Sequence, residues 1–346
     1  MRNLEIFNYI ILGSASLTAV VVLTPLMRML ARNINFVDLP KAPHKSHSKP
    51  VPYLGGAAIV ISVLSTVFVS LALRGTNDEI ETGVLTLTPS LIMAFVGLID
   101  DKFELKPMTR FIVQTSIAVG VTIFIVSRGE LGNPTGITNL DILISIIWIV
   151  GITNSINFFD NIDGGATGTV AFISVGIFLI SISNGQYLIS AMAVVLVSAS
   201  IGFLIWNKAP ASIYMGDTGA LFLGFLLAIL TIRLDTNSSS IFISFLVPVL
   251  LLAVPILDTT VAVLSRIRRR ISPFMGGQDH ISHRLLRLGL SKKITVYSLW
   301  LGTLLYCGLA VFLALGILNE SFVASFGAIS WLALLIFFLN TADEVF

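Results

Sequence analysis

Charge is scarce in this sequence. Only 12% of its 346 residues are Asp, Glu, Lys or Arg, whereas a soluble domain carries about 25%. Hydrophobic residues make up 55% and arrive in blocks of roughly 17–25, the length that crosses the hydrocarbon core of a bilayer. The composition excludes a soluble globular domain and predicts an all-α integral membrane protein.

Cysteine, repeats and phosphate-loop motifs are also missing or rare. The single Cys307 lies inside an apolar block, so an intramolecular disulfide is excluded. No GxxxxGK[ST] motif occurs, which argues against nucleoside triphosphate hydrolysis. With no internal repeat or linker, residues 1–346 are predicted to form a single membrane domain. The first apolar block, about 7–30, exceeds a signal-peptide core and lacks a small-residue cleavage site, so we expect a retained helix.

The apolar blocks predict eleven transmembrane helices. Two of them, 166–183 and 187–206, are separated only by the turn-forming SNGQ. The block at 84–99 is the shortest. The predicted spans are 6–31, 54–73, 84–99, 109–127, 139–156, 166–183, 187–206, 216–234, 240–264, 294–318 and 321–340.

Basic residues orient this arrangement. Of the 21 Lys and Arg residues, all but Arg2, Arg74, Arg128 and Arg233 fall in loops on one side. The positive-inside rule places that side in the cytoplasm. The N-terminus is then predicted outside and the C-terminus in the cytoplasm. Five polar clusters also fall on the cytoplasmic side, although Lys and Arg alone set the orientation.

The first two clusters precede and follow predicted spans. The loop DLPKAPHKSHSKPVPYLGG, residues 38–56, either touches anionic lipid headgroups or brings Lys45 and His47 to phosphate oxygens. In the second cluster, Asp100 and Asp101 are adjacent. Neighbouring carboxylates repel, which raises one pKa unless a cation lies between them. The alternative is an acidic helix end flanked by Lys102 and Lys106.

The third cluster is a polar ladder in NSINFFDNIDGG. A step of three residues turns an α-helix by about 300°, so neighbouring rungs share a face. Asn and Asp disfavour helix interiors, which makes a merely solvated helix end the weaker alternative. The oxygens are suited to Mg²⁺, phosphate or a base edge. The rungs are Asn154, Asn157, Asp160 and Asp163.

The last two clusters contain an aspartate and two histidines. Asp217 precedes an apolar helix and is either an N-cap or a ligand. Tyr214 is either a stacking face or an interfacial residue. His280 and His283 lie one helical turn apart beside Arg284, which favours phosphate contacts over a metal site because no Cys or third His is near.

One acid lies inside a predicted span. Asp258 falls within 240–264, and a charge at the centre of a membrane helix costs about 2.5–3.5 kcal/mol on insertion scales. It is therefore a functional candidate, and it favours an ion-coupled transporter as the alternative function. Transporters usually bind substrate near the bilayer midplane on repeated elements, whereas the other acids here gather at one face.

Together the clusters predict phosphoryl chemistry in a cytoplasmic cleft formed by loops. Mg²⁺ prefers one or two carboxylates together with substrate phosphates. Phosphoryl transfer needs that metal, positive groups on the phosphate oxygens and a positioned nucleophile. A site where apolar helices meet water suits one lipid-borne and one soluble substrate.

These motifs resemble the polyprenyl-phosphate N-acetylhexosamine-1-phosphate transferases, most closely the bacterial undecaprenyl-phosphate GlcNAc-1-phosphate branch and more distantly phospho-N-acetylmuramoyl-pentapeptide transferase. The resemblance covers residues 38–291 in order. Its motifs are Asp38-x-Pro40, Lys45-x-His47, Pro52-x-x-Gly55-Gly56, Gly97-x-x-Asp100-Asp101, the ladder with Gly164, Asn207-x-x-Pro210-Ala211, Met215-Gly216-Asp217-x-Gly219, Pro255-x-x-Asp258 and DHISHRLLRLGLS.

The resemblance implies transfer of a sugar-1-phosphate from a UDP-N-acetylhexosamine to polyprenyl phosphate, with release of UMP, at a bacterial inner membrane. It implies Mg²⁺ as the cofactor, with Mn²⁺ as a substitute. It implies no nucleic-acid partner, and it is compatible with a homodimer. The implied metal ligands are Asp217, Asp100 and Asp101, the last two also facing the lipid phosphate, where one could act as a base. The other implied contacts are Asn157 and Asp160 for metal and phosphate, Asn154 along the same ladder, Asn207, Asp163 and Tyr214 for uracil, and Lys45, His47, His280, His283 and Arg284 for the pyrophosphate.

One position departs from the pattern. The family's last loop often reads His-x-His-His, whereas here Ser282 precedes His283. A serine can donate a hydrogen bond but carries no charge, so the role of this position and the donor sugar are open. A second alternative is an inactive family member that binds lipid phosphate; the acids that are present argue against it.

Overall fold

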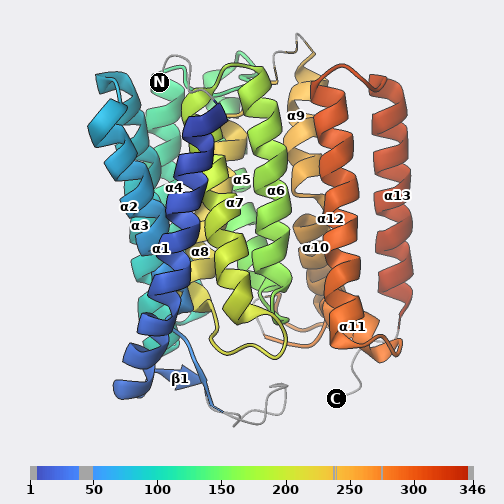
Figure 1. Ribbon diagram of the computed structural model, residues 1–346. Helices are drawn as coiled ribbons and strands as arrows, with labels where there is room; N and C mark the ends of the chain where they lie inside the picture. The colour runs from blue at the N-terminus through green and yellow to red at the C-terminus, as the bar shows by residue number, and fades with distance from the viewer. Residues whose placement is uncertain (1–5, 39–49, 237, 239, 274–275, 342–346) are drawn as a thin grey trace.

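The computed structural model describes residues 6–38, 50–236, 238, 240–273 and 276–341, and it is a bundle of α-helices (Figure 1). In the described residues, the only sheet is a hairpin of two strands with two residues each. The elements are α1 Ile6–Asn33, β1 Val37–Asp38, β2 Val51–Pro52, α2 Gly55–Arg74, α3 Asn77–Phe103, α4 Pro107–Ser127, α5 Thr138–Phe159, α6 Gly165–Ser183, α7 Tyr187–Asn207, α8 Gly216–Ile232, α9 Ile241–Leu251, α10 Ala253–Arg268, α11 Ile281–Arg287, α12 Lys292–Ala314 and α13 Glu320–Asn340.

The all-α membrane architecture is confirmed. Within the described residues, nine helices are long and apolar enough to cross a membrane, and α9 with α10 would make a tenth. Helix α8 occupies the remaining predicted span, and its 17 residues give about 25 Å of helix, somewhat less than a bilayer core. Every predicted span therefore coincides with helix, while the count of eleven crossings stays a prediction.

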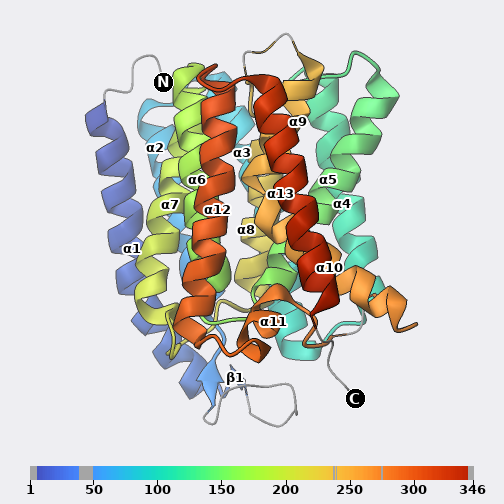
Figure 2. The ribbon, with the colours of Figure 1, turned by 90° about the vertical axis from the view of Figure 1, so that its right-hand side faces the viewer.

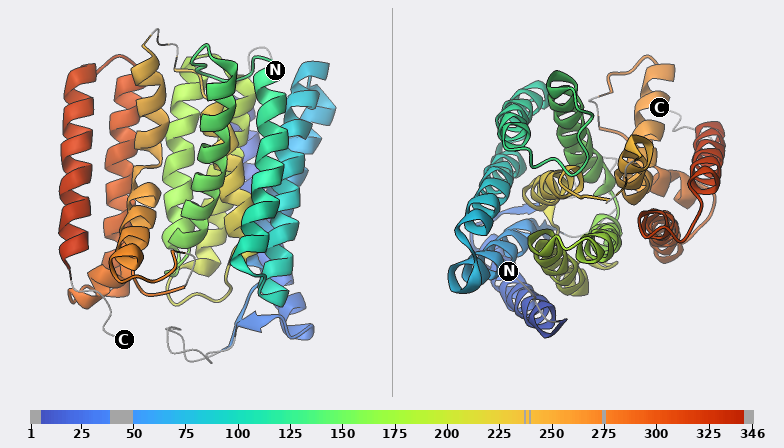
Figure 3. Two further views of the ribbon diagram at one scale, coloured as in Figure 1. Left: turned by 180° about the vertical axis from the view of Figure 1, so that it is seen from behind. Right: turned by 90° about the horizontal axis from the view of Figure 1, so that it is seen from above.

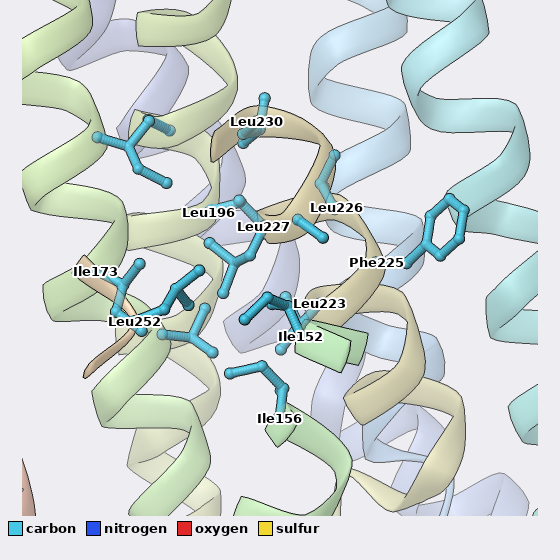
Figure 4. Close-up of a cluster of buried hydrophobic side chains, with 14 of the residues drawn as sticks. Ile152, Ile156, Ile173, Leu196, Leu223, Phe225, Leu226, Leu227, Leu230 and Leu252 are labelled. Atoms are coloured by element: carbon cyan, nitrogen blue, oxygen red, sulfur yellow. The ribbon is translucent and has the colours of Figure 1, made fainter. Parts of the chain in front are cut away.

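Helix α8 lies in the interior of the bundle. All of its residues except Asp217 and Ile232 are buried, and it packs against α3 and α5. Leu223, Leu226 and Leu227 lie beside Ile152 and Ile156 of α5 (Figure 4). Because other helices surround α8 on its whole length, its first turn is held in place from several sides (Figure 3).

Two predicted spans were wrong in detail. The third begins at Asn77 rather than near residue 84, because Thr76 and Glu79 form a capping box that starts α3 seven residues earlier. The ninth is not continuous: α9 and α10 meet at an angle of 73°. Pro255 explains the break, since its ring would clash with the carbonyl of Leu251, the last residue of α9.

The two ends of the bundle differ. Helix α1 begins at the upper end in Figure 1, and α13 ends at the lower end near α11, with the hairpin at the same end on the opposite side of the bundle. Figure 2 shows α10 running outward at that same lower end. The hairpin was not predicted; it pairs Val37 with Pro52 and Asp38 with Val51 in the antiparallel sense. The first residues of α8 also lie at the lower end, and the polar clusters meet around them.

Candidate active site

Asp101 caps the first turn of α8. Its Oδ1 accepts a hydrogen bond from the backbone N–H of Asp217 (2.8 Å), and its Oδ2 accepts from the N–H (3.0 Å) and the hydroxyl (2.7 Å) of Thr218. These bonds satisfy N–H groups that a helix start leaves without partners. Both oxygens therefore accept hydrogen bonds, and Asp101 positions Asp217; contact of Asp101 with metal or lipid phosphate stays a prediction.

Glycines allow this contact. Gly216 has φ +67°, and a Cβ at that position would lie 2.7 Å from Asp101 Oδ2. A Cβ on Gly97 would lie 2.3 Å from the carbonyl oxygen of Asp217. Both distances are too short for a side chain to be accommodated. The glycines of two sequence motifs are therefore required by the packing of α3 against the start of α8.

Arg110 lies between two carboxylates. Its Nη1 forms salt bridges with Asp100 Oδ2 and with Asp217 Oδ2, the latter at 3.0 Å. Asn157 Nδ2 donates to the other oxygen of Asp217 at 2.6 Å. The structure thus brings Asp100, Asn157 and Asp217 together, as predicted, and adds Arg110, which sequence reasoning assigned only to the cytoplasmic loops. The signal was present: an adjacent acid pair needs a cation, and Arg110 begins the next helix.

The same cluster suits a hard divalent cation. The side chain of Asp217 is 31% exposed, while that of Asp100 is 6% exposed. In the described part of the chain, no three acidic, His or Cys side chains converge as a ready-made metal site. The chain would therefore offer one or two carboxylates and leave the other positions to phosphate and water, which is the usual arrangement for Mg²⁺. Asp217 and Asp100 are the residues that fit.

The polar ladder does not form one face. Helix α5 ends at Phe159, so only two rungs are helical, and of these Asn154 donates to the carbonyl of Val150 (2.8 Å) instead of reaching Asp217. Asp160 lies just past the helix. Burial, with the charges of Asp101 and Asp163, raises the pKa of Asp160 to about 7. No group within the described residues donates a hydrogen bond to it, so its carboxyl is available to a ligand.

The expected uracil contacts divide into two kinds. Asn207 is 2% exposed. Its Oδ1 accepts from Gly164 N–H (3.1 Å) and the Thr167 hydroxyl (3.0 Å), and its Nδ2 donates to the carbonyl of Ile213 (3.2 Å). This corrects the prediction of direct uracil contact: Asn207 ties α6 to the loop before α8.

Asp163 and Tyr214 are both partly exposed. Asp163 Oδ2 accepts from the N–H of Ala211 at 3.0 Å. Tyr214 is half-buried, and burial, with the charges of Asp163, Asp38 and Asp160, raises the pKa of its phenol. The phenol is therefore protonated at neutral pH. Uracil stacking on Tyr214 stays a prediction.

The histidine segment is held by buried acids. Asp258 accepts from His280 Nδ1 (2.7 Å) and from the N–H of Ile281 (2.7 Å), while Arg266 Nη2 lies 3.4 Å from His280 Nε2. Both ring nitrogens of His280 thus lie near protein groups and the residue is 5% exposed; its contact with the pyrophosphate stays a prediction. These hydrogen bonds also explain why an acid is present at position 258, the residue that favoured the transporter alternative.

Arg284 and His283 have opposite surroundings. Arg284 is 0% exposed, and its donors bond the carbonyls of Asp279, Phe338 and Thr341 and the hydroxyl of Ser265. Arg284 therefore anchors α11 to the end of α13, and its predicted phosphate contact stays a prediction. His283 is half-buried, and burial, with the charge of His280, lowers its pKa to about 4. Lys45 and His47 lie outside the described residues.

Several known proteins have sequences similar to this one. Residues 83–235 match the profile of glycosyl transferase family 4. A Bacillus subtilis (strain 168) protein named "Probable undecaprenyl-phosphate N-acetylglucosaminyl 1-phosphate transferase" is 32% identical over 98% of this chain and 91% of its own length. A Mycobacterium leprae decaprenyl-phosphate N-acetylglucosaminephosphotransferase is 29% identical, covering 84% and 81%. A Staphylococcus carnosus phospho-N-acetylmuramoyl-pentapeptide-transferase is 31% identical over 58% of this chain and 68% of its own.

The first of these relatives extends over nearly the whole of both chains, so the similarity is not confined to one motif. The resemblance inferred from the motifs is confirmed. The chain belongs to glycosyl transferase family 4, among the polyprenyl-phosphate N-acetylhexosamine-1-phosphate transferases.

Proposed function

We propose that this protein transfers N-acetylhexosamine-1-phosphate from a UDP-sugar to polyprenyl phosphate. An oxygen of the acceptor phosphate attacks the sugar-bearing phosphorus of the donor, the bond from that phosphorus to UMP breaks, and a lipid-linked sugar pyrophosphate remains. The observation that carries the proposal is Asp217 held between Arg110 and Asn157 at the polar end of an apolar bundle. The names of the relatives agree with it.

Mg²⁺ bound at Asp217 and Asp100 would neutralise charge on the reacting phosphates. The chain's own groups supply the rest. Arg110 offers a permanent cation beside the same carboxylates, suited to a phosphate oxygen. Asn157 orients Asp217 by donating to one of its oxygens. Asp101 accepts a hydrogen bond from the backbone N–H of Asp217 at the start of α8. This bond orders the cluster before substrate binds.

Asp160 is suited to a proton-transfer role. Its pKa of about 7 matches the range in which a general base works best near neutral pH. The acceptor phosphate loses its second proton near pH 6, so Asp160 would take the proton from the minority of acceptor that is still protonated. This role is secondary to charge neutralisation at the phosphates.

The orientation of the membrane protein supports a cytoplasmic site. The acids lie at the end of the bundle where basic loop residues collect, which the positive-inside rule assigns to the cytoplasm. UDP-sugars are soluble and charged, so the donor would enter from that side, while the lipid acceptor would enter from the bilayer. In a bacterial cell, a donor that enters from the cytoplasm would require the protein to lie in the inner membrane.

The test is UMP release by the detergent-purified protein. Undecaprenyl phosphate, Mg²⁺ and each of several UDP-N-acetylhexosamines would be supplied, with Asp217→Asn as the control. We expect release that requires the lipid, that is highest with one donor, and that falls at least about a thousandfold in the variant. An absence of release with every donor, from protein that binds neither lipid phosphate nor nucleotide, would reject the proposal.

A further inference from the structure

One hydrogen bond connects the acidic turn after α5 to the histidine segment. The hydroxyl of Ser282 donates to Oδ1 of Asn161. Asn161 lies between Asp160 and Asp163, and its Nδ2 donates to the carbonyl of Phe158 at 2.7 Å, which fixes the side chain. Ser282 is 1% exposed. A hydrogen bond shielded from water in this way is stronger than one at the surface.

The other hydrogen bonds of α11 connect it with α10 and with the end of α13, not with the turn after α5. Asp258 holds the first turn of α11 to α10 through His280 and Ile281, and Arg284 holds it to α13. Phe158 packs edge-on against the ring of His280, with centroids 5.9 Å apart, but that contact has no hydrogen-bond direction. Within the described residues, Ser282–Asn161 is the hydrogen bond that connects residues 281–287 with residues 154–165.

His283 is the group that this bond orients. It follows Ser282 directly, and its ring lies 6.2 Å from the ring of His280 between centroids. No described residue forms a hydrogen bond with its ring nitrogens, in contrast to His280. Because His283 follows Ser282 in the seven-residue helix α11, the bond from Ser282 to Asn161 also restricts the movement of His283 relative to the turn after α5.

We propose that Ser282 and Asn161 are positioning residues for donor binding: their hydrogen bond holds the start of α11, which carries His283, to the turn that carries Asp160 and Asp163. This inference rests on the proposed transferase function and extends it to two residues that do not themselves touch substrate. It also explains why a serine suits position 282. The side chain is enclosed, and a small hydroxyl reaches Asn161 where the ring of a histidine would have to displace it.

The test measures KM for the UDP-sugar donor and KM for the polyprenyl-phosphate acceptor separately. Ser282→Ala and Asn161→Ala are each expected to raise KM for the UDP-sugar about tenfold, because a displaced binding group weakens binding. KM for polyprenyl phosphate and kcat are expected to change less than twofold. Ser282→Thr, which keeps the hydroxyl, is expected to restore the donor KM. The double variant should be no worse than either single variant, because both remove the same bond.

A matched control is Ser291→Ala. Ser291 lies on the same side of the bundle and accepts a bond from the N–H of Ile294 at the start of α12. Its loss should lower the melting temperature and leave both KM values unchanged. The inference is overturned if Ser282→Ala keeps the wild-type donor KM, if both KM values rise together, or if the two single effects add. Failure of wild-type protein to release UMP would reject the proposed function instead.

Discussion

The two ends of the bundle use charged residues in different ways. At the upper end Arg128 pairs with Glu81 (2.6 Å) and Glu130 (3.2 Å), and Arg233 pairs with Glu130 (2.9 Å). At the lower end Arg110 is shared by Asp100 and Asp217. Asp160 there accepts no hydrogen bond from a described residue.

The backbone follows the same division. At the upper end, side chains satisfy the chain itself: Gln186 donates to the carbonyl of Arg233 (2.8 Å) and Asn133 to that of Leu234 (2.7 Å). At the lower end, Asp100 and Asp217 share one arginine, Arg110, as their salt-bridge partner in the described residues. Matched charges hold helices together, whereas neighbouring carboxylates repel one another and a bound cation relieves that repulsion. The comparison therefore assigns stability to one end and chemistry to the other.

Metal removal is expected to have the largest effect. Chelation with EDTA should abolish UMP release, and added Mg²⁺ should restore it, because Asp100 and Asp217 are the carboxylates suited to hold the cation. Addition of Mg²⁺ should also raise the melting temperature of wild-type protein, since a ligand that binds only the folded state stabilises it. Asp217→Asn should lose most of that rise. A rise of equal size in the variant would show that the cation binds elsewhere.

Replacing one arginine at each end tests directly whether the lower end serves catalysis and the upper end serves stability. Arg110→Met should reduce kcat about 100-fold or more, because it removes a cation next to the reacting phosphates. Arg110→Lys should retain part of the activity, since a point charge remains without the planar guanidinium. Arg233→Met should change kcat less than twofold and lower the melting temperature. Equal kinetic effects of the two Met variants would contradict the division.

Within the upper end, burial should decide the size of the effect. Glu130 is 19% exposed and faces the buried Arg233, while Glu81 is 46% exposed. Glu130→Gln should lower the free energy of unfolding by about 1–3 kcal/mol, the range for leaving a buried charged group unpaired. Glu81→Gln should lower it by less than about 1 kcal/mol. Thermal unfolding of both variants, with UMP release as the second measurement, checks the order.

The smallest effect concerns pH. Because the folded state raises the pKa of Asp160 from 3.8 to about 7, the folded state favours the protonated carboxyl, and its stability falls as pH rises between those values. Asp160→Asn removes that loss. In buffer without divalent cations, wild-type protein should lose about 2 °C more in melting temperature between pH 5 and pH 8 than the variant. Parallel curves would show that Asp160 is not perturbed.

Much of this division could be predicted from the sequence. Long apolar blocks force helices, because a bilayer offers backbone groups no other partner, and so each predicted span coincides with helix. The third and ninth spans differ because a capping box at Thr76 and a ring clash at Pro255 act locally and override hydropathy. The adjacent acids and Asp217 could be predicted as site residues because few other charges occur in so apolar a chain.

The partners of these residues required the tertiary structure. Arg110 is 107 positions before Asp217, and Asn161 is 121 positions before Ser282, so no local pattern links them. His280 and Arg284 look like ligands in the sequence, and only packing shows that buried acids and carbonyls already occupy them. The sequence by itself determined a membrane bundle with its polar clusters at one end, because hydrophobicity and charge act residue by residue. The tertiary structure decided which polar groups are consumed and which are left for a ligand, because a hydrogen bond depends on distance and direction in space.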